Sequence, residues 1–230
     1  MPPRLISFLT SLLTPLVLLG LALRLLLSPL FLQVEYRMPG FPADTYGFTR
    51  EDRLRWAPFA VTYLTSNEGT DFLGNLRFDD GTPLYNEREL SHMDDVKIVT
   101  RGALNIFYGA LAGLALLGLW SRRPQQWQAF RQGLKRGGWI MVGLAGAVGV
   151  VVLVGMFLIP DLFWAFFEGF HSLFFEGDSW LFLYSDTLIR LFPIRFWQDT
   201  FLFAAGLAVL GGLGLGLGIR DHASASHLSQ

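Results

Sequence analysis

Apolar residues are gathered into four long blocks along the chain, separated by segments in which polar and charged residues return. A helix needs about 20 apolar residues to cross a bilayer core of roughly 30 Å, and each block is near that length. We predict membrane-spanning helices over residues 5–32, 103–120, 138–159 and 201–219. The pattern therefore predicts an all-α polytopic membrane protein with four transmembrane helices, folded as a single integral membrane domain over residues 1–230.

Composition supports this class, because 52% of the residues are hydrophobic and the mean hydropathy is +0.40. The first block has one rival interpretation, since it follows Arg4 and a basic residue before an apolar stretch is also typical of a secretory signal peptide. The block is too long for a signal peptide, although it carries Arg24, and residues 33–36 offer no small-x-small cleavage motif. An uncleaved helix is favoured.

The charges between the blocks give the chain an orientation. Residues 121–137 contain five basic and no acidic residues, which is typical of a cytoplasmic loop. Residues 33–101 contain twelve acidic and eight basic residues, and residues 161–199 contain six and two. We therefore expect extracytoplasmic segments over 33–102 and 160–200. Arg4 and Arg220 then place both termini in the cytoplasm of the cell, with a short disordered tail over 221–230.

The fourth block is rich in glycine, which permits helices to approach one another closely in a membrane. We interpret these residues as packing positions: Gly206, Gly211, Gly212, Gly214, Gly216 and Gly218.

Several kinds of chemistry are excluded by what the sequence lacks. Cysteine is absent, so there are no disulfides, thiol nucleophiles or thiolate metal sites. The extracytoplasmic segments contain no Gly-x-Ser-x-Gly elbow, no HExxH motif and no third histidine, so neither a serine nucleophile nor a metal is expected. No cofactor is expected. Phosphate-binding loops and nucleic-acid-binding patches are missing as well, because topology accounts for the basic loop.

The first extracytoplasmic segment predicts two helices. Thr49 caps one that runs to Thr65, and Asn86 with Glu89 forms a capping box that begins another. If the second continues unbroken into the span at 103–120, His92 lies roughly 16 Å before that span, at headgroup depth. Asp95 lies on the same face of this helix as His92.

The second extracytoplasmic segment contains a strongly aromatic stretch over residues 161–176 with polar side chains at helical spacing. We predict an interfacial or re-entrant helix here, with Glu168 and His171 close together on it. Aromatic belts at the membrane boundary explain its Phe and Trp residues but not the histidine, and ionisable groups at this depth are candidate site residues. Asp186 is expected to cap a short helix further on.

His92 and His171 are thus the two histidines of the extracytoplasmic segments, each with a carboxylate within helical reach. Each taken alone is equally well explained as an interfacial hydrogen-bonding residue. Brought together, they could act as a general acid/base pair, with Asp95 and Glu168 orienting the rings.

Two stretches of sequence resemble one known family. Glu89-Leu-Ser-His92-Met-Asp-Asp95-Val-Lys97 is similar to the E-L-x-H-M-x-D-V-K signature of the bacterial lipoprotein intramolecular transacylase (Lit) family. Phe170-His171-Ser-Leu-Phe-Phe175, followed by Trp180 and by Asp186-Thr-Leu-Ile189, resembles its second signature. The resemblance implies that His92 and His171 are catalytic, with Asp95, Glu168, Glu89, Lys97 and Asp186 in supporting positions.

The resemblance also implies an activity and its partners. The enzyme would move the sn-2 acyl chain of a diacylglyceryl-cysteine lipoprotein to the α-amino group of that cysteine, in contact with membrane lipid. Such a transfer needs a base and an acid but no enzyme nucleophile, in keeping with this sequence. Which histidine is the base stays open. The alternatives are a non-catalytic membrane protein that binds lipid or a protein partner, and a different acyl transfer or lipid hydrolysis.

Overall fold

The structure, a computed structural model, describes residues 1–219, which form nine α-helices and no β-strand. The helices are α1 (Pro3–Leu26), α2 (Pro29–Glu35), α3 (Arg50–Thr65), α4 (Asp71–Gly74), α5 (Glu87–Trp120), α6 (Pro124–Phe157), α7 (Pro160–Ser172), α8 (Thr187–Leu191) and α9 (Ile194–Gly218). Four of them, α1, α5, α6 and α9, are long and apolar enough to cross a membrane. The all-α fold with four spans is confirmed; the predicted tail at 221–230 lies outside the described residues.

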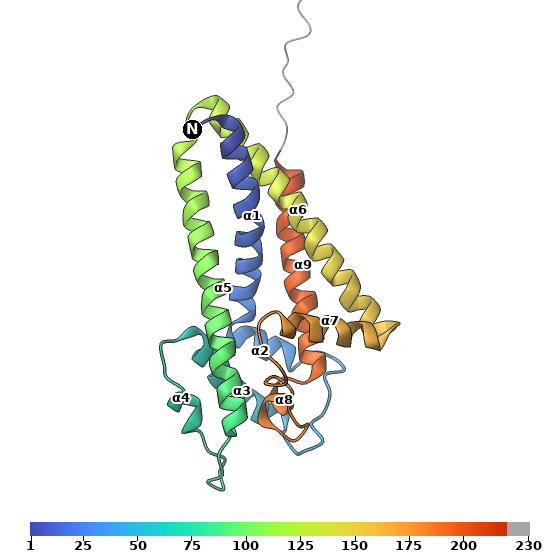
Figure 1. Cartoon of the computed structure of the whole chain (residues 1–230). Helices are drawn as coiled ribbons and strands as arrows, with labels where there is room; N and C mark the ends of the chain where they lie inside the picture. The colour runs from blue at the N-terminus through green and yellow to red at the C-terminus, as the bar shows by residue number, and fades with distance from the viewer. Residues whose placement is uncertain (220–230) are drawn as a thin grey trace, which may run out of the picture.

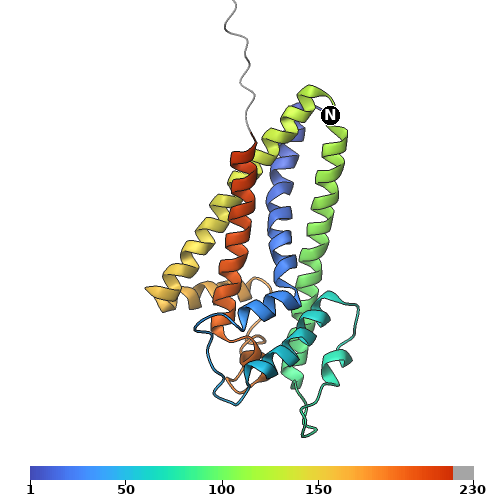
Figure 2. The ribbon, with the colours of Figure 1, turned by 180° about the vertical axis from the view of Figure 1, so that it is seen from behind.

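The short helices gather at one end of the bundle. Figure 1 shows α2, α3, α4, α7 and α8 at the end opposite the N-terminus, and the reverse view in Figure 2 shows the same arrangement. We call this end the head region and define it as residues 28–93 and 159–193. Both segments that carry a candidate histidine therefore lie at the same end of the four long helices.

The sequence predicted one helix from residue 5 to Leu32, but the first apolar block forms two helices. The α1 helix ends at Leu26, and Ser28 then caps α2 by accepting a hydrogen bond of 3.3 Å from the Phe31 amide. Pro29 occupies the first turn of α2, where its missing N–H costs nothing, but it could not continue α1 without losing a backbone hydrogen bond. The last residues of the block therefore turn into the head region.

The basic segment 121–137 is also different from the expected loop. Only residues 121–123 connect α5 to α6, because α6 begins at Pro124 and includes the rest of the segment. Arg, Lys, Gln and Ala are strong helix formers, and proline is favoured in a first turn, so a polar segment can extend a membrane helix beyond the bilayer core.

Close contact between α6 and α9 depends on two glycines. A Cβ atom on Gly212 would lie 2.6 Å from the carbonyl oxygen of Gly138, and one on Gly138 would lie 2.7 Å from the carbonyl oxygen of Gly212. The prediction that glycines allow helix contact is confirmed here. It is wrong for Gly206, Gly214 and Gly218, which have no atom within 4 Å of such a Cβ.

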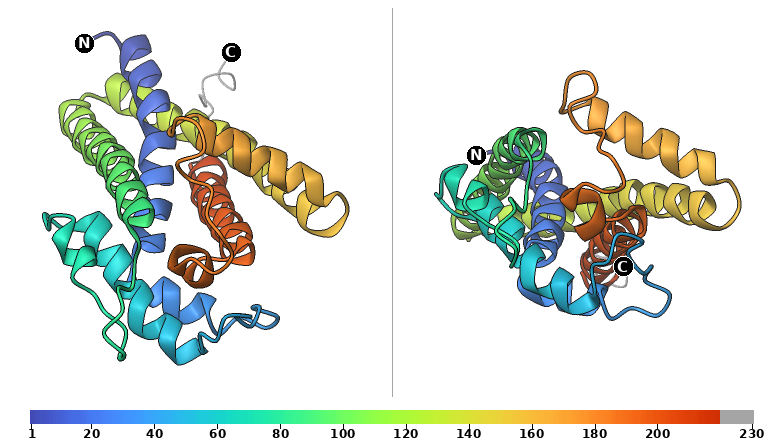
Figure 3. Two further views of the ribbon diagram at one scale, coloured as in Figure 1. Left: turned by 60° about the horizontal axis from the view of Figure 1, so that its bottom comes forward. Right: turned by 90° about the horizontal axis from the view of Figure 1, so that it is seen from below.

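The α7 helix, the predicted aromatic helix, folds back from the end of α6 and crosses the bundle at the edge of the head region (Figures 1 and 3). Its turn is tight, because a Cβ on Gly155 of α6 would lie 2.7 Å from the Phe163 amide nitrogen. Phe163 and Phe167 bury their rings against Val152. The polar end of α7, which carries His171, is thereby directed toward the centre of the head region.

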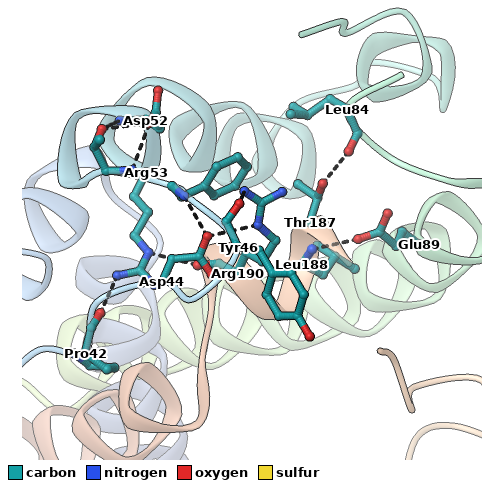
Figure 4. A network of polar contacts seen from close by, with 12 residues as sticks. Pro42, Asp44, Tyr46, Asp52, Arg53, Leu84, Glu89, Thr187, Leu188 and Arg190 are labelled. Atoms are coloured by element: carbon teal, nitrogen blue, oxygen red, sulfur yellow. Dashed lines mark hydrogen bonds and ion pairs between the residues drawn. The ribbon is translucent and has the colours of Figure 1, made fainter. Parts of the chain in front are cut away.

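The rest of the head region has its own hydrophobic core and a polar network that ties its connections together. The core joins α2, α3, α5, α8 and the start of α9. In Figure 4, Arg53 donates to the carbonyl oxygens of Arg190 (2.8 Å) and Pro42 (2.7 Å), and Arg190 pairs with Asp44 at 3.0 Å. These bonds join segments far apart in the sequence, so they hold the connections of the head region to α3 and α8.

Candidate active site

His92 and His171 meet in the head region although they lie on different helices, α5 and α7. The ring of Phe175 contacts both of them: its centroid is 4.9 Å from that of His92 and 5.7 Å from that of His171. The two imidazole centroids are therefore no further apart than the sum of these distances, 10.6 Å. An acid/base pair serving one substrate needs this proximity.

His171 is held in one orientation. It is 7% exposed, stacks on Trp180 with centroids 4.7 Å apart, and lies 4.1 Å from Phe167. Its Nδ1 atom is 2.8 Å from the carbonyl oxygen of Phe167, and a carbonyl can only accept, so Nδ1 carries the proton. Nε2 therefore has the free lone pair. Burial lowers the pKa of His171, although its bond to Phe167 acts in the opposite direction, so the ring is neutral near pH 7.

His92 lies in a more apolar setting. Its side chain is 9% exposed and contacts the rings of Phe175 and Phe182, the latter at 5.2 Å. Within residues 1–219, its buried Nδ1 atom has no hydrogen-bond partner. Buried polar atoms are normally paired, and an exception calls for an explanation such as a catalytic role or a missing ligand.

The carboxylates expected to orient the histidines do not do so in this structure. Asp95 and Glu168 are both exposed, and in the described part of the chain neither forms a hydrogen bond with a histidine. A backbone carbonyl, that of Phe167, takes the orienting position at His171 instead.

Two other predicted supporting residues, Glu89 and Asp186, hold backbone segments near the site. The buried carboxylate of Glu89 accepts from the amides of Asn86 (2.8 Å) and Leu188 (2.7 Å), which forms the predicted capping box and joins α5 to α8 (Figure 4). Asp186 is at the N-cap of α8 but makes no cap bond; it accepts from the Leu183 amide at 2.9 Å. Glu89 lies three residues before His92, and Leu183 directly follows Phe182, whose ring contacts His92. Both carboxylates bind backbone amides, so we interpret them as structural.

Lys97 is directed away from the histidines. Its ammonium donates to the carbonyl oxygen of Glu68 and lies 3.8 Å from the ring centroid of Tyr63. It therefore ties α5 to the segment between α3 and α4. Arg88, which directly precedes the motif, donates to the carbonyl oxygen of Asp178 at 2.6 Å and so holds the segment after α7 against α5.

A buried carboxyl group at Glu35 was not predicted from the sequence. This side chain is 0% exposed, and as a carboxylate it has no hydrogen-bond partner among residues 1–219. Burial and the nearby Asp199 raise the pKa of Glu35 to about 8. Asp199 itself pairs with Arg195 at 2.6 Å, and a protonated Glu35 is able to donate to it.

The described residues contain no group of three or more His, Cys, Asp or Glu side chains that could hold a metal ion. What the fold and site define is a multi-pass membrane protein with two buried histidines at one end of its bundle.

Comparison with known proteins gives the family. Residues 8–197 match the family described as lipoprotein intramolecular transacylase Lit. An uncharacterised protein of Aquifex aeolicus (strain VF5) is 31% identical over 210 residues, which cover 91% of each chain. The chain belongs to the Lit family.

Solved structures agree on the fold. The membrane-integral lipoprotein intramolecular transacylase Lit from Bacillus cereus matches with a TM-score of 0.74 at 17% identity, covering 93% of this chain and 92% of that one. A histidine-to-arginine variant of the same Bacillus protein matches with a TM-score of 0.64 at 16% identity, covering 95% and 90%.

Proposed function

We propose that this protein is a membrane acyltransferase that converts a diacylglyceryl-cysteine lipoprotein into its lyso form. The cysteine nitrogen attacks the carbonyl carbon of the sn-2 ester, a C–N bond forms, and the ester C–O bond breaks. Starting from its ammonium form, the nitrogen loses two protons: one is released to give the attacking amine, and the other leaves after attack and balances the proton that the glyceryl oxygen takes up. Membership of the Lit family and the two histidines brought together in the head region support this proposal.

The observation that carries the mechanism is the fixed tautomer of His171. With Nδ1 donating to the Phe167 carbonyl, Nε2 can accept a proton from the substrate's ammonium group. We therefore assign His171 as the base. His92 is assigned as the group that hydrogen-bonds to the oxyanion and then gives its proton to the leaving glyceryl oxygen, and the second proton lost by the nitrogen replaces it.

The acyl chain passes between two atoms of one molecule, so the enzyme's main contribution is to hold amine and ester in a reactive geometry. The aromatic rings around both histidines exclude water, which would otherwise hydrolyse the ester. The apolar faces of the spanning helices would accommodate the acyl chains.

The proposed active face is extracytoplasmic. The head region contains the two acidic segments, whereas the basic residues at 121–137 lie at the opposite end with the N-terminus (Figure 1). Because cytoplasmic segments carry the excess of Lys and Arg, both termini are assigned to the cytoplasm.

The proposal is tested in cells that express a reporter lipoprotein together with wild-type protein, His92→Ala or His171→Ala. Mass spectrometry of the reporter's N-terminal peptide gives the number and position of its acyl chains. We expect lyso-form reporter with the wild type and diacylglyceryl reporter with either variant. Lyso-form with both variants, at equal protein levels in the membrane, would contradict the assignment; no lyso-form with any protein would favour a non-catalytic lipid or partner binder.

A further inference from the structure

A second polar site lies on the other side of α5 from the histidines. Arg101, Asn105 and Tyr108 follow one another at helical spacing, and with Arg24 of α1 and the end of α3 they line an open groove of about 170 Å³. Arg101 is nine positions after His92 on α5, and at about 100° per residue this places the two side chains about 180° apart around the helix. The groove is therefore separate from the proposed active site.

The two arginines in the groove lack a charged partner. Arg24 donates a single bond of 3.4 Å to the carbonyl oxygen of Leu27, and Arg101 donates to the side-chain oxygen of Asn67. In the described residues neither guanidinium forms an ion pair, and no acidic residue lines the groove. Two arginines that line one groove without a carboxylate are suited to a bidentate anion such as phosphate.

The position of the groove along the helices corresponds to a headgroup layer. Arg24 lies in the last turn of α1, and Arg101 directly precedes the apolar part of α5. On the same helices Leu25 is 58% and Ile98 71% exposed, as expected of side chains that face lipid. An arginine at this depth reaches toward the interface with its charged end.

We propose that Arg24 and Arg101 bind the phosphate group of a bilayer glycerophospholipid, with Asn105 and Tyr108 as further hydrogen-bond donors. The diacylglyceryl-cysteine substrate proposed above has no phosphate at its glycerol, so the lipid held here is a different molecule. It would fill the groove between α1 and α5 and fix the head region relative to the bilayer. This inference does not depend on the proposed activity.

The test is lipid binding to the purified full-length protein in detergent, measured by native mass spectrometry. The probes are dioctanoyl-phosphatidylglycerol and dioctanoylglycerol, which lacks the phosphate, with inorganic phosphate as competitor. The protein variants are Arg24→Gln/Arg101→Gln, the charge-conserving Arg24→Lys/Arg101→Lys, and the control Arg50→Gln, which removes an exposed charge elsewhere in the head region.

We expect the glutamine double variant to weaken phosphatidylglycerol binding by about tenfold or more, the lysine variant to weaken it less, and Arg50→Gln to have no effect. Dioctanoylglycerol should bind weakly and equally to all four proteins. Equal phosphatidylglycerol binding by wild type and the glutamine variant would overturn the proposal, as would equal binding of the two lipids by the wild type. Displacement by inorganic phosphate at the lipid's own concentration would show a site for free anions instead. If the glutamine variant does not fold, the comparison rests on the lysine variant.

Discussion

At the scale of single residues, the tautomer and burial of His171 decide what it can do. Its Nδ1 atom is bonded to a backbone carbonyl, so a neutral, buried His171 can accept a proton only at Nε2. The residue type could be read from the sequence, but its partner could not, because Glu168, the carboxylate expected three positions before His171, is exposed and makes no hydrogen bond to the ring. Local helix geometry supplied the carbonyl of Phe167 instead.

The lowered pKa of His171 makes a prediction about the pH profile. A base must be neutral, so activity is lost as pH falls through the pKa of His171, below its ordinary value of 6.5. Trp180→Ala removes the ring stacked on His171 and admits water, so its pKa rises toward the ordinary value. We expect the acid limb of kcat/KM in the purified enzyme to move to higher pH.

The matched control is Trp164→Ala, which removes an exposed tryptophan from α7, the helix that carries His171. Its acid limb should coincide with that of the wild type. An unchanged acid limb in Trp180→Ala, with retained activity, would show that burial by Trp180 does not set the pKa of His171.

At the scale of the helices, the ends were predictable where side chains fix them locally. The cap at Thr49 and the capping box at Asn86 were predicted directly from the sequence, and both are present, the former as a full capping box with Asp52. The sequence analysis missed the break between α1 and α2 and the early start of α6. Hydropathy identifies residues suited to the bilayer core, but it does not locate the ends of a helix. Local caps and prolines, rather than the end of an apolar run, determine where these helices begin.

The contact of α6 with α9 makes a prediction at this scale. Gly212→Ala forces a Cβ against the Gly138 carbonyl oxygen, so the helices must separate. Gly214→Ala adds the same methyl group where there is open space, and alanine favours a helix by about 1 kcal/mol over glycine. Thermal unfolding in detergent should show a lowered midpoint for Gly212→Ala and an equal or raised one for Gly214→Ala. Equal midpoints would mean that this contact does not limit stability.

At the scale of the whole molecule, topology is what brings the two candidate histidines together. Four spans deliver both polar segments to one end of the bundle, a consequence that the sequence pattern does predict. The aromatic enclosure made by Phe167, Phe175, Phe182 and Trp180 was not predictable, because interfacial aromatics are ordinary in membrane proteins. Only their packing around the histidines distinguishes them.

The proposed orientation can be tested with single cysteines, since the chain has none of its own. Glu87→Cys lies in the head region and Gln125→Cys at the opposite end, and both positions are exposed. A membrane-impermeant maleimide should label Glu87→Cys in intact spheroplasts and Gln125→Cys only after permeabilisation. The reverse pattern would place the histidines on the cytoplasmic side.

The most direct test of the central claim follows one acyl chain through the reaction in the purified protein. The substrate is a synthetic diacylglyceryl-cysteine peptide with isotope in both the sn-2 chain and the peptide, mixed with an equal amount of unlabelled substrate. Mass spectrometry should show N-acylated peptides in which labelled chain and labelled peptide always occur together, and none with His171→Ala. Exchange of label between peptides, release of free fatty acid in place of N-acylation, or unchanged product with His171→Ala would contradict an intramolecular transfer driven by this histidine.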